Sequence, residues 1–534
     1  MRISTAQYFE TSAAKYQKNY SDTVKTQAQI SSGDRIQSAS DDPIGASRLL
    51  QLQQQKALLT QYGDNMTSLK SSLTTEESVL SGINDSLQKA RELAIQGGGS
   101  ISDEDRRSIA NQIGEIEKQV LGMLNTKDST GEYLFSGSKS STPPYIQNSD
   151  GTYSYQGDET QLSLQVSDTL SLASNDTGYS LTEQTPNASR TQASQLVPTL
   201  PAVINDRVSV SSGLIASDVA YTNDFKMGEP YTVTFSSSTQ FKVFSGTTDV
   251  TAEIAGNGSF DPGAVGGSTF KLRGVDFEIN VQAKAEELPA DFDQAISGQS
   301  FSLTSKPDDI KVTRLAANVS SAQITSASVD NAANYSAAFP NSGAVLRFGA
   351  VSGADIAYSV FAQPYKEGDT AIASGVKTAA DTSITAAGVK FDFAAGFSAP
   401  ASGDQFAVKV TAHETKSVLN TLGDLRQALL APTGNSTSSQ NKLDEAIGSA
   451  LSNLSLSMDR NDLVRGSIGA RMNSIDIQTT ENGTISLNNK ATQTDIGSTD
   501  VADASIQLTL QQTMLQASQL AFVKISQLSL FNKL

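Results

Sequence analysis

The sequence contains no cysteine and only one histidine, His413, among 534 residues. Without cysteine the chain can form no disulfide, thiolate metal site, iron–sulfur cluster or thiol nucleophile. One histidine cannot make a two-histidine metal site, and the residues after Glu414 do not complete a zinc-peptidase motif. We therefore expect no enzyme, no metal and no cofactor. A hydrolase that uses carboxylates alone stays open as a distant alternative, although no carboxylate pair stands out.

Positive charge is also scarce, with 39 Lys and Arg against 56 Asp and Glu, a net charge of −17. Such a polyanion repels nucleic acid and anionic membranes, so we expect neither as a partner. No apolar core of a secretory signal follows Arg2, and the uncharged stretch 504–523 contains five glutamines. The chain is expected to be soluble, or to be exported without a cleaved signal peptide.

Proline is nearly absent from both ends of the chain, since 13 of 14 prolines lie between Pro143 and Pro432. Phenylalanine is concentrated in the same region, with 16 of 20 between Phe225 and Phe406. Ends without proline favour helices, and an aromatic middle favours strands. We predict an α+β, multi-domain fold: a long helical coiled-coil rod built from both chain ends, with a β-rich duplicated insert in the middle.

A heptad pattern predicts one long helix over about 44–96. Residues 59, 62, 66, 69, 73, 80, 83, 87, 90 and 94 are apolar, and within this series only Glu76 is charged. Three glycines at 97–99 end the pattern, and Ser102 is placed to cap a shorter helix. The helix would be roughly 80 Å long at 1.5 Å per residue.

The two extreme ends have weaker apolar patterns. The N-terminal heptad includes Ala6, Phe9, Ala13, Tyr16, Tyr20, Thr23, Gln27 and Ile30, and the C-terminal stripe includes Leu510, Met514, Ala517, Ala521, Ile525 and Leu528, broadened by Leu515 and Phe522. Lone helices bury too little surface to be stable. We therefore expect these ends to pack against neighbouring subunits and to lack a sufficient partner within their own chain.

The middle of the chain repeats short strand motifs in the same order. The motifs at Tyr231, Phe241, Gly274 and Ser297 recur 113, 117, 114 and 105 residues later. Two diverged β modules, at about 228–306 and 342–410, explain this order better than chance matching of short motifs.

Residues 30–46 resemble the N-terminal signature of the flagellin superfamily, with a Ser-Ser-Gly, a basic-apolar pair and a double aspartate. Further resemblance lies at 131–137, 155–158, 465–471 and 528–534, so it covers about 1–180 and 411–534. The region 190–410 falls where the superfamily varies. In this signature Gly33 permits a left-handed helix end, and Asp41 or Asp42 can cap a helix that has Pro43 in its first turn.

The resemblance implies a non-enzymatic structural part of the bacterial flagellum that is extracellular and exported by the flagellar type III apparatus. Pro43 after the aspartates, and both chain ends, are similar to the hook–filament junction members (hook-associated protein 3). Those members join the hook, through hook-associated protein 1, to the flagellin filament. Filament flagellin remains an alternative because the insert is large, and a secreted β-repeat adhesin is a more distant one.

The resemblance also implies domains and partners. Residues 1–43 and 500–534 would form an inner assembly domain, 44–180 and 411–499 a helical rod with a β-hairpin, and 190–410 the outward insert. The implied partners are copies of the chain in a ring-like layer, hook-associated protein 1, flagellin and an export chaperone. The predicted assembly interface comprises Phe9, Tyr16, Ile30, Gly33, Arg35, Ile36, Asp41, Asp42, Pro43, Leu510, Met514, Leu515, Ala517, Phe522, Ile525 and Leu528.

Overall fold

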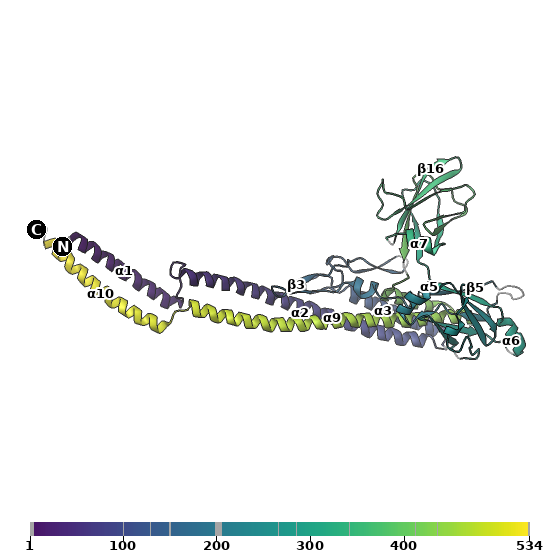
Figure 1. Ribbon diagram of the computed structural model, residues 1–534, viewed down its shortest axis with the longest axis horizontal. Coiled ribbons are helices and arrows are strands. Elements are labelled where there is room, and N and C mark those ends of the chain that lie inside the picture. Colours follow the sequence, from purple (N-terminus) through teal and green to yellow (C-terminus); the bar gives the residue numbers. More distant parts are fainter. Residues whose placement is uncertain are drawn as a thin grey trace. The chain divides into compact units, whose positions relative to one another are not determined.

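The computed structural model describes residues 5–99, 101–128, 130–148, 151–197, 205–264, 266–284, 286–340, 342–411, 413–434 and 436–531 (Figure 1). These residues form two compact units, each assembled from segments distant in sequence. The first unit takes its residues from Met1–Thr75, Leu162–Asn175 and Ser467–Leu534, and the second from Glu76–Gln161 and Asp176–Gly466.

Long helices occupy both ends of the chain. They are α1 (Thr5–Ser32), α2 (Pro43–Gly97), α3 (Asp103–Leu124), α8 (Val418–Leu430), α9 (Thr437–Gly497) and α10 (Val501–Phe531). The predicted long helix is confirmed as α2 and ends at Gly97. The hydroxyl of Ser102 accepts a hydrogen bond from the Asp105 backbone N–H at 3.2 Å, so it caps α3 as predicted.

Each unit buries one part of the α2 heptad. Leu69 and Leu73 are fully buried in the first unit, and Leu80 and Leu87 are buried in the second. Glu76, the charged exception, is also buried, and one of its carboxylate oxygens accepts a hydrogen bond from the Asp176 backbone N–H at 3.0 Å. Because this hydrogen bond partly offsets the cost of burying the carboxylate, a charged residue is tolerated in the heptad.

The first β module forms two sheets around an aromatic core. Its strands are β5 (Thr191–Leu196), β6 (Val208–Val210), β7 (Leu214–Ile215), β8 (Tyr231–Ser237), β9 (Gln240–Ser245), β10 (Thr248–Asp249), β11 (Ser268–Leu272), β12 (Val275–Val281) and β13 (Ser300–Ser305). One sheet has the order β10-β9-β8-β13-β5, and the other has the order β11-β12-β6, with β7 also paired to β12. Alternate residues of β8 and β12 point into the core.

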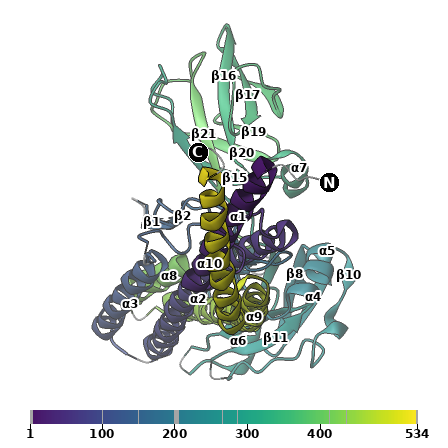
Figure 2. The same ribbon diagram turned by 90° about the vertical axis from the view of Figure 1, so that its left-hand side faces the viewer.

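The second β module forms a single sheet (Figure 2). Its strands are β14 (Asp309–Arg314), β15 (Ile324–Val329), β16 (Ala344–Ser352), β17 (Asp355–Ala362), β18 (Ala373–Lys377), β19 (Ser383–Ala386), β20 (Val389–Phe393) and β21 (Gln405–Thr411). Their order is β18-β17-β16-β21-β14-β15-β20-β19. Apart from β7, this order matches that of the first module when β5 is aligned with β14.

Turn geometry is repeated as well as strand order. Arg273 and Gly274 have φ values of 46° and 86°, and Ala387 and Gly388 have φ values of 48° and 78°. Both pairs join two strands in the hairpin conformation that needs positive φ at both turn residues. The shared pattern begins at β5 and β14, upstream of the starts at 228 and 342 that the sequence motifs predict.

Smaller elements complete the second unit and the hairpin of the first. They are β1 (Tyr145–Gln147), β2 (Tyr153–Tyr155), β3 (Ser163–Gln165), β4 (Ser171–Ala173), α4 (Asp218–Ala220), α5 (Lys226–Gly228), α6 (Pro289–Ile296) and α7 (Ala332–Ala338). The predicted α+β class, with helical ends and a β-rich middle, is confirmed. Across the described residues, every helix is too short or too polar to span a bilayer.

Candidate assembly surface

Helices α1 and α10 lie side by side in the first unit (Figures 1 and 2). The Asn19 side-chain amide donates a hydrogen bond to the Ser518 hydroxyl at 2.7 Å, and the Tyr16 and Phe522 rings stack with their centroids 6.3 Å apart. The pairing is antiparallel, since Tyr16 precedes Asn19 and Phe522 follows Ser518. The sequence predicts that the terminal segments lack a sufficient partner within their own chain; in the structure the two weak seams face each other, so each terminal helix has an intramolecular partner.

Beyond Tyr16, the seam of α1 keeps the predicted Thr23 and Ile30 but not the predicted Tyr20 and Gln27. The residues turned inward are Asn19, Thr23, Thr26 and Ile30, whereas the predicted Tyr20 is 56% exposed. Thr23 and Thr26 can be buried because each hydroxyl donates to a backbone carbonyl four residues earlier, at 2.7 and 3.0 Å. The seam is thus polar but satisfied within the helix.

The apolar residues of α10 lie on two different faces. Leu515 and Phe522 are half-buried on the face that carries Ser518, toward α1. Leu510, Met514 and Ala517 are exposed and lie outside this seam. Together with the exposed Ile506, Leu520 and Val523, they form what we call the outer stripe. The side chains of Phe9, Ile525 and Leu528, also predicted at the interface, lie outside the described part of the chain.

The predicted signature forms the turn between α1 and α2 and fastens it to the end of α9. Gly33 adopts φ +78°, and its carbonyl accepts a hydrogen bond from the Thr499 backbone N–H at 2.8 Å. The Arg35 backbone N–H donates to the Gly497 carbonyl at 2.7 Å, and its guanidinium donates to the Ile496 carbonyl at 2.8 Å. The signature therefore brings the ends of four helices, α1, α2, α9 and α10, to one place.

The two aspartates of the signature have different roles. Asp42 caps α2, because its Oδ1 accepts a hydrogen bond from the Gly45 backbone N–H at 2.9 Å, with Pro43 at the first helical position. Asp41 instead accepts from the backbone N–H groups of Gln37 and Ser38, at 3.1 and 2.9 Å. Its ion pair with Lys25, at 2.7 Å, ties the turn back to α1. Hydrogen bonding to Lys25 and to the Ser38 backbone lowers the pKa of Asp41 to about 2.

Ile36 and Gly45 fit together inside this turn. A Cβ atom added to Gly45 would lie 2.7 Å from the Ile36 Cδ1 and 2.5 Å from the Asp42 Oδ2, so only glycine fits without displacement. Gly45 was absent from the predicted site, as were Lys25 and Asp500. Asp500 directly precedes α10 and caps it, because its Oδ1 accepts hydrogen bonds from the Ala502 and Asp503 backbone N–H groups at 2.9 and 3.2 Å.

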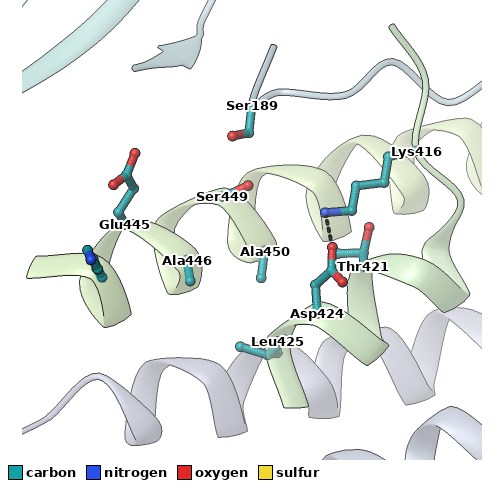
Figure 3. A pocket seen from close by; sticks show the side chains of 10 residues that line it. Ser189, Lys416, Thr421, Asp424, Leu425, Glu445, Ala446, Ser449 and Ala450 are labelled. Atoms are coloured by element: carbon teal, nitrogen blue, oxygen red, sulfur yellow. Dashed lines mark ion pairs between the residues drawn. The ribbon is translucent and has the colours of Figure 1, made fainter. Parts of the chain in front are cut away.

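A polar pocket lies between α8 and α9 in the second unit (Figure 3). Its Lys416 is paired with Asp424 at 2.6 Å, and its Glu445 accepts the Ser212 backbone N–H at 2.7 Å. These charges are engaged in holding neighbouring segments together. Within the described ranges, no three His, Cys, Asp or Glu side chains gather so as to hold a metal ion.

Comparison with known proteins finds similarity to flagellar proteins in the first part of the chain. Residues 3–140 match the family model described as the bacterial flagellin N-terminal helical region. Flagellar hook-associated protein 3 of Salmonella typhimurium is 34% identical over 179 residues, which are 33% of this chain and 56% of that protein. The Escherichia coli protein of the same name is 33% identical over the same shares. The chain thus spans about half the length of the curated relatives that it matches.

A crystal structure of flagellar hook-associated protein 3 from Legionella pneumophila covers 83% of this chain and 98% of its own, with a TM-score of 0.45 and 21% sequence identity. The N-terminal match and the two curated relatives confirm the resemblance stated from the sequence: residues 3–140 match the flagellin N-terminal helical region, in a chain that is similar to flagellar hook-associated protein 3.

Proposed function

We propose that this chain is a non-enzymatic structural adaptor of the bacterial flagellum that joins the hook to the flagellin filament. Its similarity to hook-associated protein 3 supports this assignment. The observation that carries it is the outer stripe: even after α1 and α10 have paired, several large apolar side chains of α10 stay exposed, including Leu510 and Met514. Large apolar side chains that stay exposed together on one helix indicate a protein–protein contact.

The size of the outer stripe is suited to assembly. Burying one half-exposed Leu, Ile, Val or Met side chain contributes on the order of 1 kcal/mol. One stripe therefore contributes a few kcal/mol, which is too little for a stable dimer but accumulates when every subunit in a layer uses the same surface. An adaptor that stays monomeric in solution and assembles in place needs this balance.

The proposed partners follow from this surface. They are copies of the chain in a ring-like layer, hook-associated protein 1, flagellin, and an export chaperone that covers α10 in the cytoplasm. From Ala504 onward the only charged residues are Lys524 and Lys533. Such a segment would aggregate unless a chaperone covered it. We propose no nucleic-acid or membrane partner, an extracellular location, and export without a cleaved signal peptide.

Within this proposal, residues 1–43 and 500–534 form the inner assembly domain, and 44–180 with 411–499 form the helical rod. Residues 190–410 face outward. The turn at Gly33 supports the first boundary, because it is where α1 ends and the chain is fastened to the start of α10.

The decisive experiment is electron microscopy of a strain that lacks the gene. The adaptor assignment expects bare hooks, with filament protein shed into the medium, and restoration by the full-length gene. The second candidate, filament flagellin, is favoured by the large insert and by 27% identity to a Salmonella budapest flagellin over 314 residues. Under that assignment the purified protein would polymerise by itself into long filaments.

A further inference from the structure

Helices α2 and α9 contact each other at several points along the length that they share in the first unit, up to the end of α9. The Asn482 side-chain amide donates to the Leu59 carbonyl at 2.8 Å. Near the end of the pair, a Cβ atom added to Gly497 would lie 3.4 Å from the Leu49 side chain, which is ordinary van der Waals contact. The two helices therefore do not splay apart before α9 ends.

The chemistry of this contact changes along its length. Up to Ile475, the contact contains an apolar core in which Met66, Leu69, Leu73 and Ile475 are each no more than 2% exposed. Beyond Ile475, the one α9 residue that is buried as a whole is Asn489, which is 8% exposed. The apolar core thus gives way to a contact whose buried residue is an amide.

That amide is not satisfied by the protein. The Asn489 Nδ2 has no hydrogen-bond acceptor among the described residues, and neither has the buried Nε2 of Gln493, one turn further along α9. The buried hydroxyl of Thr499, just past the end of α9, also lacks a partner within the described chain. Each buried polar group left without a partner costs about 1–3 kcal/mol. Two of these groups, the amides of Asn489 and Gln493, lie one turn apart in α9, and Thr499 lies two residues past its end.

We propose that this segment, residues 486–497 of α9 with residues 45–56 of α2, is a joint that opens locally while the rest of the α2–α9 contact stays closed. We call it the soft joint. Opening lets water reach the amides of Asn489 and Gln493 and so removes their penalty, while little apolar burial is lost. Opening the apolar core around Ile475 would instead expose buried apolar surface, so that part of the contact resists opening.

The soft joint lies where its opening can affect the direction of the α1–α10 pair. It adjoins the turn that Arg35 and Gly33 fasten to the backbone at 496–499. When the joint opens, that anchorage loosens, and the α1–α10 pair can change its direction relative to α2. This property goes beyond the proposed function and does not depend on it, because it concerns the isolated chain.

Hydrogen exchange of the purified full-length protein, read by mass spectrometry, tests this proposal directly. We expect backbone amides in 486–497 to be at least about tenfold less protected than those in 467–478. Replacing the buried amide by an apolar side chain, Asn489→Leu, should raise protection in 486–497 by about tenfold. The matched control is Asn488→Leu at the neighbouring exposed position, which should change protection there by less than about twofold.

Equal protection of the two segments in the unmodified protein would overturn the proposal without any variant. It would also be overturned if Asn489→Leu and Asn488→Leu gave the same exchange, since the buried amide would then not govern opening. Neither result bears on whether the chain joins hook to filament, which the gene-deletion experiment tests separately.

Discussion

Two adjacent residues of α10, Met514 and Leu515, lie on different surfaces of this helix. One surface packs against α1, and the other is the outer stripe proposed to contact neighbouring subunits. Leu515 lies seven residues before Phe522 and three before Ser518, on the face that contacts α1. Met514 is 49% exposed on the outer stripe. Placing the same carboxylate at each position, as Leu515→Asp and Met514→Asp, perturbs one surface at a time.

The expected magnitudes differ because the burial differs. Leu515 is half-buried, so its loss removes about 1–2 kcal/mol of apolar burial, and partial desolvation of the new carboxylate adds about 1 kcal/mol. A polar seam such as that of α1 and α10 has little stability in reserve, so a loss of about 2–3 kcal/mol should separate the pair. Met514→Asp changes an exposed position and should cost the monomer less than about 0.5 kcal/mol.

Hydrogen exchange of residues 16–30 in dilute monomer reports the α1–α10 pairing, and electron microscopy of complemented cells reports incorporation. Leu515→Asp should abolish protection of this segment and also block filament formation. Met514→Asp should leave the protection unchanged and still block filament formation, although the variant is secreted. Normal filaments with Met514→Asp would refute the outer stripe as an interface, and unchanged exchange with Leu515→Asp would refute the internal pairing.

Three further outcomes are expected. The native hydrogen bonds and the Lys25 ion pair lower the pKa of Asp41, so the stabilisation that Asp41 gives the turn should be complete above about pH 4 and lost as the pH falls through 2. Hydrogen exchange of residues 33–42, followed across that pH range, checks this. In Asp41→Asn the same residues should be poorly protected at every pH. Glu117→Ala should lower the free energy of unfolding, measured by denaturant titration, by about 3–5 kcal/mol. The reason is that Glu117 is 3% exposed and accepts hydrogen bonds from the Tyr153 hydroxyl and the Arg426 guanidinium at 2.6 and 2.8 Å. The control, Glu115→Ala at an exposed position, should lower it by less than about 1 kcal/mol. Residues 309–411 can be excised cleanly, because the first and last of them pair across β14 and β21. The shortened protein should still be secreted, and the rest of the chain should keep its melting transition. Loss of secretion would show that the module is not autonomous.

The long helices could be predicted from the sequence because their signals are local. Heptad spacing and a run of glycines are enough to place α2 between Pro43 and Gly97. The start of each β module could not be placed in the same way. Strand β5 reads Thr-Gln-Ala-Ser-Gln-Leu, and such polar residues carry no apolar alternation; the strand forms because β13 supplies its hydrogen bonds.

The turn between α1 and α2 shows the same limit at the level of single residues. Its own aspartates, glycine and proline were recognisable, because caps and turns use characteristic residue types. What Arg35 holds was not recognisable, since a backbone carbonyl such as that of Ile496 has no sequence signal and lies 461 residues away. The α1 seam was assigned to Tyr20 in place of Asn19 because apolarity was used as the guide, whereas Asn19 pairs with a serine.

The soft joint governs local opening of the α2–α9 contact, and the outer stripe governs incorporation into the filament. A double variant tests whether these two effects are independent. Asn489 lies in α9 and Met514 in α10, 25 residues apart along the chain, with no hydrogen bond or ion pair joining them. Effects at separate sites without shared partners should add. In Asn489→Leu with Met514→Asp, exchange of 486–497 should therefore slow as much as in Asn489→Leu alone, while filaments stay absent as in Met514→Asp alone. Recovery of filaments in the double variant would mean that the outer stripe acts through the soft joint. The stripe would then guide the direction of the α1–α10 pair and would not itself be buried against a neighbouring subunit.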